Sequence, residues 1–239
     1  MLISAATTRA LDDIAVRERD LLQAFAPGAV AQRGDVAKPQ TAQPVLDPLS
    51  AAPPANALFI SSGDDGRMLF TRDGSFSLRD GALVDAQERP ILGYAGNSRV
   101  LGPLKIDPVD VALGFASTAR IDADGALSYE RSTIDPRTGR REMQRAVAGR
   151  LALARFAPGT NLQAVDAQHS AAPLGIAPHI GYSGDGNFAA LTPFAREGSG
   201  IDIDTGVQRL QEAYLALDAI RAAGKAQGGI DKATMDLLK

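Results

Sequence analysis

The sequence predicts an α+β protein in which a mostly antiparallel β-domain carries long N- and C-terminal helices that pair in a coiled-coil-like bundle. Two observations lead to this fold class. Apolar residues recur at helical spacing near both ends of the chain, and short alternating segments with Asp-Gly turns fill the middle. The predicted parts are an N-terminal helix at 1–26, a Pro/Ala-rich connector at 27–56, a β-rich domain at 57–197 and a C-terminal helix at 198–239.

Composition excludes several classes of protein before any motif is considered. The 239 residues are 45% apolar but only 5% aromatic and contain no Trp, so we expect a thin core. A net charge of -3 argues against binding to nucleic acid. The absence of cysteine excludes disulfides and cysteine metal sites. We expect no membrane span, because no apolar run is long enough, and no cleaved signal peptide.

The N-terminal helix is predicted over residues 2–25. Its apolar side chains recur at spacings of three, seven and four, which places them on one helix face. These residues are Leu11, Ile14, Leu21 and Phe25. Pro27-Gly28 ends the helix. Because the apolar stripe is narrow, the helix requires a partner helix for stability.

The connector and the β-domain follow. Five prolines between Pro39 and Pro54 forbid a long helix and a central strand, so the connector is expected to be extended. The β-domain centres on a meander over 68–93, in which Asp73-Gly74 and Asp80-Gly81 each predict a tight hairpin turn.

Further strand and turn signals flank the meander. Leu58–Ile60 is a short apolar run, and residues 150–156 alternate as a strand with Leu151 and Leu153 on one face. The segment 134–141 has the chemistry of a hairpin tip, and residues 170–187 are expected to be loop because they are rich in Gly, Pro and Ser.

The C-terminal helix carries a heptad pattern. Its apolar residues recur at spacings of four and three, which is typical of helices that pack lengthwise. They are Ile203, Val207, Leu210, Tyr214 and Leu217. Thr205 with Gln208 predicts a capping box at the start, and Gly224 and Gly228-Gly229 are expected to end the helix. The simplest arrangement pairs the two terminal helices, either within one subunit or between neighbouring copies.

Residue types that could carry chemistry have simpler explanations. His169 and His179 could form a metal site, but no third ligand is near, and two loop histidines are favoured. The Asp122–Gly125 segment faintly resembles a calcium loop, but a hairpin turn explains it better. Gly63–Gly66 and Gly184–Asn187 lack the strand-to-helix context of phosphate loops and are interpreted as turns.

One basic segment allows two interpretations. Its charged residues could contact an acidic partner, although a solvated hairpin is the more usual explanation. They are Arg137, Arg140, Arg141, Arg145 and Arg150. The sequence contains no Gly-x-Ser-x-Gly elbow and no other catalytic constellation. We therefore predict no enzyme activity and assign no catalytic, cofactor-binding or metal-binding residues.

Several segments together resemble one known family. They are Phe70–Leu78, Asp80–Val84, Pro90–Gly93, Ile121–Ser128, Gly149–Phe156, Arg196–Ile203 and Gln211–Tyr214. Their order, with an aromatic residue, Thr-Arg, a small residue, Gly, any residue and Phe in the first, is similar to flagellar basal-body rod and hook proteins. The chain departs from the family at its N-terminus, where Asp20–Val30 lacks the usual Asn-rich motif and Ala57–Ile60 replaces Gly-x-Gly-Phe-Phe.

The resemblance implies a structural subunit of the periplasm-spanning rod of the bacterial flagellum. Such a subunit is exported without a cleaved signal by the flagellar type III apparatus and self-assembles into the axial drive shaft for motility. Its partners would be copies of itself, neighbouring rod and hook proteins and the export apparatus. The expected subunit contacts are the apolar residues of the two terminal helices given above.

Two other functions remain open at this point. The chain could be a monomeric binding module whose β-domain meets a partner while the helices close the fold. It could also be a hydrolase of cell-wall glycan with carboxylates in a cleft, although no catalytic constellation indicates this.

Overall fold

The computed structural model describes residues 2–29, 40–96 and 98–237, with side chains described from residue 5 to residue 227 of these. The chain divides into two compact units. Of the described residues, 2–25 and 200–237 form one unit, which contains the terminal helices; 26–29, 40–96 and 98–199 form the other, the β unit.

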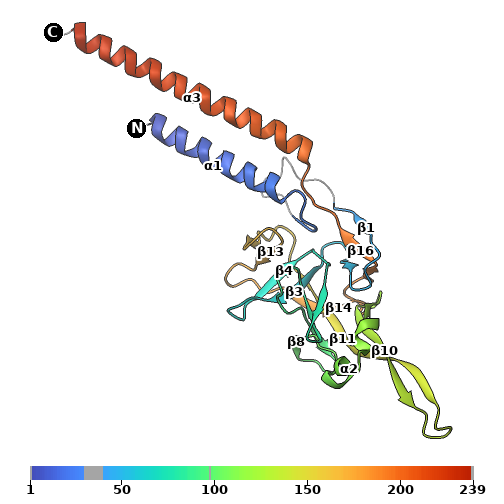
Figure 1. Cartoon of the computed structure of the whole chain (residues 1–239). Coiled ribbons are helices and arrows are strands. Elements are labelled where there is room, and N and C mark those ends of the chain that lie inside the picture. The colour runs from blue at the N-terminus through green and yellow to red at the C-terminus, as the bar shows by residue number, and fades with distance from the viewer. Residues whose placement is uncertain (1, 30–39, 97, 238–239) are drawn as a thin grey trace. The chain divides into compact units, whose positions relative to one another are not determined.

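The predicted fold class, an α+β protein with a coiled-coil-like bundle, is wrong. The described residues form mainly strands, including one large antiparallel sheet, together with three α-helices. The terminal helices exist as α1 (Leu2–Gln23) and α3 (Ile203–Leu237), and they pack antiparallel against each other (Figure 1). Their contact is not the predicted coiled-coil seam, because large residues of that seam remain exposed.

Both ends of α3 differ from the prediction. Asp202 caps the helix start, where its carboxylate accepts hydrogen bonds from the backbone N–H groups of Asp204 at 3.1 Å and Thr205 at 3.3 Å. The predicted capping box of Thr205 and Gln208 is therefore wrong, since an aspartate one turn earlier takes its place. The helix also continues through Gly224 and Gly228-Gly229 to Leu237. Glycine lowers helix propensity by about 1 kcal/mol but does not by itself end a helix.

The large sheet is built around one long strand, β11 (Arg141–Arg155). Antiparallel neighbours of β11 are β3 (Leu58–Ser62), β7 (Leu92–Ala95), β10 (Ala126–Ile134) and β14 (His179–Tyr182). The remaining strands of this sheet are β4 (Met68–Thr71), β8 (Leu101–Pro103), β9 (Arg120–Ile121), β12 (Gln163–Ala164) and β13 (His169–Ala171). β10 and β11 form a long hairpin that reaches beyond the rest of the sheet (Figure 1).

The alternation of β11 connects two apolar clusters. Leu151 and Leu153 belong to the main core, whereas Ala152 and Ala154 face a smaller cluster that includes Phe70. This confirms the alternating strand predicted at 150–156. The expected loop at 170–187 is wrong where β13 and β14 form, because pairing with β4 and β11 recruits segments that carry no strand pattern of their own.

The remaining elements are short. β5 (Ser77–Arg79) and β6 (Ala82–Val84) form a hairpin, and α2 (Pro108–Ala112) and the 3-10 helix η2 (Phe115–Thr118) were not predicted. The connector contains no helix in its described part, as expected, and its residues 30–39 lie outside the described residues. Its strands β1 (Ala42–Pro44) and β2 (Ala51–Ala52) pair with β16 (Ala195–Glu197) and β15 (Thr192–Pro193). Among the described residues, no helix is long and apolar enough to cross a membrane.

The two Asp-Gly pairs of the meander have different roles. Asp80 and Gly81 have φ angles of 50° and 78°, which confirms the predicted two-residue turn between β5 and β6. The hairpin predicted at Asp73-Gly74 is wrong, since β4 does not pair with β5. Gly74 instead lies against the connector: a Cβ there would be 1.7 Å from the carbonyl oxygen of Ala51. The small residue is needed for this close approach.

The other predicted turns are confirmed. Gly63–Gly66 joins β3 to β4, and Asp122–Gly125 joins β9 to β10. Gly184–Asn187 follows β14 as a turn, and the segment 134–141 forms the tip of the β10–β11 hairpin.

The packing at Gly74 leads to a first prediction. Gly74→Ala should lower the free energy of unfolding of the protein by about 3 kcal/mol, because the new methyl group overlaps backbone that cannot rotate away. The matched control is Gly102→Ala, since a Cβ at that strand position meets nothing within 4 Å. It should change stability by no more than about 1 kcal/mol. Urea unfolding followed by circular dichroism measures both, and equal effects would contradict the proposed contact.

Candidate functional site

Residues 71–76 belong to the segment that resembles the rod and hook pattern. They hold the β unit together through several contacts, and we call them the clamp. The hydroxyl of Thr71 accepts a hydrogen bond from the N–H of Asp73 at 2.9 Å, and Phe76 packs edge-to-face on Phe59 with ring centroids 5.0 Å apart. Gly74 lies against Ala51, as described above. Successive motif positions therefore each hold the chain in place.

Arg72 is the centre of this clamp. Its guanidinium donates through Nη2 to Oε1 of Glu197 at 2.6 Å and through Nε to Oε2 of the same carboxylate. A further bond runs from Nη1 to the carbonyl oxygen of Ala57 at 2.9 Å. Both side chains of the ion pair are largely buried. A buried two-point pair of this kind fixes the relative position of β4 and β16.

Both chain connections toward the helices meet at Glu197. Its carbonyl oxygen accepts a hydrogen bond from the N–H of Gly28 at 3.1 Å, and β16 pairs with β1 of the connector. Gly28 follows α1 in the sequence, and Glu197 precedes α3. The Arg72–Glu197 pair therefore anchors the entry and the exit of the β unit at one place.

A second polar cluster surrounds His169. The prediction of two loop histidines is wrong for this residue, because His169 is buried in β13. Its Nε2 lies 2.9 Å from Oδ2 of Asp85, and its Nδ1 lies 2.9 Å from Oδ1 of Asp166. Arg89 donates to the other oxygen of Asp166 at 2.7 Å. The cluster joins the turn after β6 to the turn before β13.

The electrostatics of this cluster favour a charged imidazole. Burial disfavours the cation, but hydrogen bonds and charges from Asp85 and Asp166 outweigh burial and raise the pKa of His169 above 6.5. Burial raises the pKa of Asp166, but hydrogen bonds from the Gln168 N–H, Arg89 and His169 have the larger effect. These bonds lower the pKa of Asp166 to about 2. Because its charged groups pair with one another, the cluster holds the two turns together.

The described residues contain no group of three or more His, Asp or Glu side chains placed to hold a metal ion. His179 is exposed on β14 and stacks on Phe188 with ring centroids 5.8 Å apart, whereas the partners of His169 are Asp85 and Asp166. The two histidines therefore do not meet.

The helix unit places the predicted contact residues of α3 on two faces. Ile203, Leu210 and Leu217 lie on its buried or half-buried face. Gly206 and Ala213 complete this face, so that small residues alternate with the large ones. A Cβ at Gly206 would be 2.8 Å from Cδ2 of Leu21, which shows how closely α1 approaches. Val207 and Tyr214, predicted for the seam, lie beside it and are 42% and 45% exposed.

The predicted residues of α1 are also divided. Ile14 is buried and Leu21 is half-buried, whereas Leu11 is 46% exposed. Phe25 lies beyond the helix end and is 83% exposed. The buried face of α1 instead includes polar groups such as the ion pair between Arg17 and Asp13 at 2.9 Å. The prediction assumed that the large apolar residues define the buried face. It therefore missed that the helix buries a different face, which includes polar side chains.

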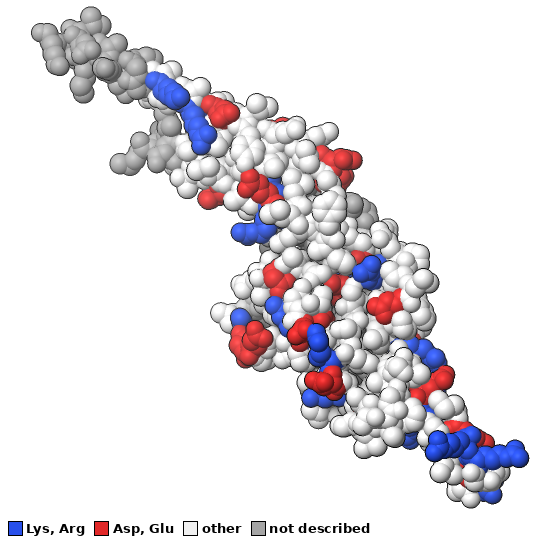
Figure 2. Space-filling view, in the orientation of Figure 1, with Lys and Arg blue, Asp and Glu red and all other residues white. Residues whose placement is uncertain are grey.

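The solvated hairpin predicted for the basic segment is confirmed. Its arginines are exposed along β11 and the turn before it, and positive side chains gather at the hairpin tip in Figure 2. Apolar side chains are exposed beside them, namely Ile134, Met143 and Val147. A mixed surface of this kind is typical of protein contacts rather than of a catalytic cleft.

No family model matches the chain, and no curated protein matches it in sequence.

The clamp leads to a prediction for Arg72→Lys. Lysine keeps the charge but cannot form the forked contact with Glu197, so the unfolding free energy should fall by about 3 kcal/mol. The matched control is Arg79→Lys, in the exposed ion pair with Glu88, which should change stability by no more than about 0.5 kcal/mol. Urea unfolding measures both variants. Equal effects of the two substitutions would contradict the anchoring role of Arg72.

The His169 cluster predicts a dependence of stability on pH. The pKa of His169 is raised in the folded state, so its contribution is present below pH 6.5 and is lost as pH rises through the folded value. The pKa of Asp166 is lowered, so its contribution is present above pH 3.8 and is lost as pH falls toward about 2. His169→Gln should therefore destabilise the protein most between these limits, by about 3 kcal/mol, and less at alkaline pH.

Urea midpoints measured across acidic and alkaline pH test this expectation. The control is His179→Gln, which removes the other histidine of the chain from an exposed position. A destabilisation by His169→Gln that stays constant with pH would show that the charge of the imidazole is not involved.

Proposed function

We propose that this protein is a structural subunit of the bacterial flagellar basal-body rod and that it assembles with copies of itself and with neighbouring rod and hook proteins. It would be exported without a cleaved signal and act in the periplasm-spanning axial shaft. The observation that carries the proposal is the set of large apolar side chains left exposed on helices that already pack against each other.

These side chains occur on both helices and at the end of α1. Leu22 and Leu215 are 84% and 70% exposed, in addition to the predicted contact residues that remain outside the helix pair. Burying a side chain of this size contributes about 1.5–3 kcal/mol. Their concentration in a unit of two helices, which is too small to bury them itself, supports association with further helices.

The lengths of the helices point in the same direction. α1 has 22 residues and α3 has 35. At 1.5 Å per residue they measure roughly 33 Å and 52 Å, so α1 is too short to cover about 20 Å of α3. An isolated helical end of this kind is marginal in water, and packing against a neighbouring subunit would stabilise it.

The β unit supports the proposal in another way. It has its own core, so it can fold independently of partners. The positions shared with the rod and hook pattern, from Thr71 to Phe76, are those that lock this unit and anchor the segments leading to the helices. The exposed β10–β11 hairpin offers a second contact surface. A mechanical subunit needs such a rigid body with separate contact surfaces.

Self-association tests the proposal. Sedimentation velocity of the purified chain should show assemblies that grow with concentration, and Leu22→Ser with Phe25→Ser should weaken association about tenfold or more, since two apolar side chains are lost from the contact. The matched control is Leu174→Ser, because Leu174 is at least as exposed as these residues but lies in the β unit. It should associate as the unaltered chain does.

Limited proteolysis of the unassembled chain distinguishes the alternative functions. The assembly proposal expects rapid cleavage in α1 and α3 and a resistant fragment extending from about residue 40 to residue 199. A chain that stays monomeric, with helices as resistant as the β unit, would overturn the proposal and favour the self-contained binding module.

A further inference from the structure

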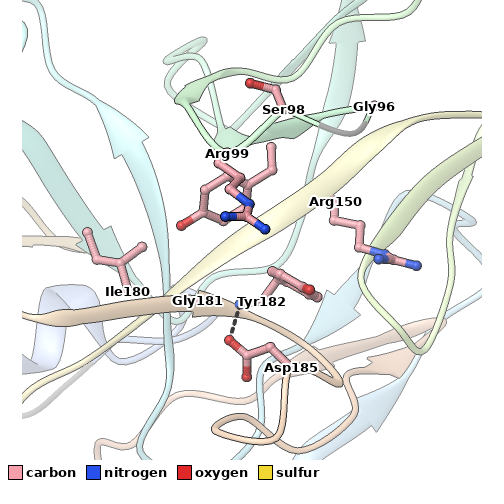
Figure 3. Close-up of a pocket in the computed structure, with 9 residues that line it drawn as sticks. Gly96, Ser98, Arg99, Arg150, Ile180, Gly181, Tyr182 and Asp185 are labelled. Carbon is pink, nitrogen blue, oxygen red and sulfur yellow. Dashed lines mark hydrogen bonds between the residues drawn. The ribbon is translucent and has the colours of Figure 1, made fainter.

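A pocket of about 430 Å³ opens in the β unit between the β7–β8 hairpin and strands β11 and β14 (Figure 3). Its polar and aromatic lining comes from all of these elements and from the turn after β14. These side chains are Tyr94, Ser98, Arg99, Arg150, Tyr182 and Asp185. None of them has a role in the clamp, in the His169 cluster or on the helices, so the pocket is a separate feature of the molecule.

Two tyrosines form one wall of the pocket. The rings of Tyr94 and Tyr182 meet edge-to-face, with centroids 6.0 Å apart and an interplanar angle of 71°. The Arg150 guanidinium lies over the Tyr182 ring, 5.4 Å from its centroid. In the part of the chain that the structure describes, neither phenol hydroxyl has a hydrogen-bond partner, so both are available to a ligand.

One arginine in the pocket has no acidic partner among the described residues. Arg99 forms no ion pair with any described residue, and its side chain is drawn toward the pocket in Figure 3. Arg150 reaches Asp124 only at 3.3 Å on the exposed side. Asp185, the carboxylate that lines the pocket, forms no ion pair with Arg99 and accepts backbone hydrogen bonds instead. These come from the N–H groups of Tyr182, Asn187 and Phe188, at 3.1, 2.7 and 3.2 Å.

We infer that this pocket binds a saccharide that carries a carboxylate. Tyrosine rings offer an apolar surface for the C–H groups of a pyranose ring, and their hydroxyls bind sugar hydroxyls. A guanidinium fork binds a carboxylate through two parallel hydrogen bonds. The volume lies in the range that small ligands occupy. With a single unpaired guanidinium, the pocket suits one acidic ring rather than a long acidic peptide. This inference does not rest on the proposed function.

The chain provides its own optical probe for the test. It contains no Trp and four Tyr, of which Tyr94 and Tyr182 line the pocket, so tyrosine fluorescence reports on the site. N-acetylmuramic acid and N-acetylglucosamine are matched ligands, because only the first carries a carboxylate. The acidic sugar should change the fluorescence saturably and bind about tenfold or more tightly than the neutral sugar.

Two variants localise the binding. Arg99→Gln should weaken the acidic sugar about tenfold and leave the neutral sugar unchanged, whereas Arg137→Gln, an exposed arginine at the hairpin tip, should change neither. Equal affinity for both sugars, an unaffected Arg99→Gln variant or no saturable response would overturn the inference. Binding of a short oligoglutamate peptide in preference to the sugar would overturn the ligand class. Neither the comparison of ligands nor the comparison of variants depends on self-association. A negative result in them therefore does not bear on the proposed function.

Discussion

The buried ion pair between Arg72 and Glu197 is the contact on which the β unit depends. It joins two residues 125 positions apart and closes about half of the 239-residue chain into one loop. Two charges out of water are stable only when both are satisfied, and here the guanidinium also binds a backbone carbonyl. Breaking the pair would leave a buried charge at the place where the connector and the segment before α3 are paired as β1 and β16. The pair thus holds together, within the β unit, the two chain segments that lead to α1 and to α3.

The helix pair depends on a different constraint, which is how closely α1 and α3 can approach each other. A heptad pattern counts large apolar residues, and it correctly placed Ile203, Leu210 and Leu217 on the inner face of α3. It failed at Val207 and Tyr214 because the adjacent Gly206 and Ala213 allow α1 to come closer than larger residues would. Small residues gain packing contacts through proximity rather than through their own area. The large residues on the flanks then remain exposed, which is why a close helix pair leaves apolar surface uncovered.

The same distinction explains what the sequence could and could not predict. Local signals were reliable: Asp80-Gly81 makes its turn because both residues tolerate positive φ, and Leu151 and Leu153 alternate in a strand. Contacts between distant segments leave no local pattern. Asp73-Gly74 has the composition of a turn, but its glycine serves a close approach to Ala51. The burial of His169 between two aspartates is likewise decided by neighbours up to 84 positions away. The pocket depends on such distant pairs too, and no spacing in the sequence indicates it.

The separation of the two units has a consequence for how function can be tested. The main core of the β unit contains no residue of α1 or α3, so its stability does not depend on the side chains that the helices expose. Substitutions at sites that share no partner are close to additive in free energy. A change in association caused by Leu22 or Phe25 should therefore occur without a change in the unfolding of the β unit, whereas a change at Arg72 should affect unfolding first. If exposed helix residues altered the stability of the β unit as well, the two units would be energetically coupled, and the helices would belong to a closed monomeric fold rather than to an assembly surface.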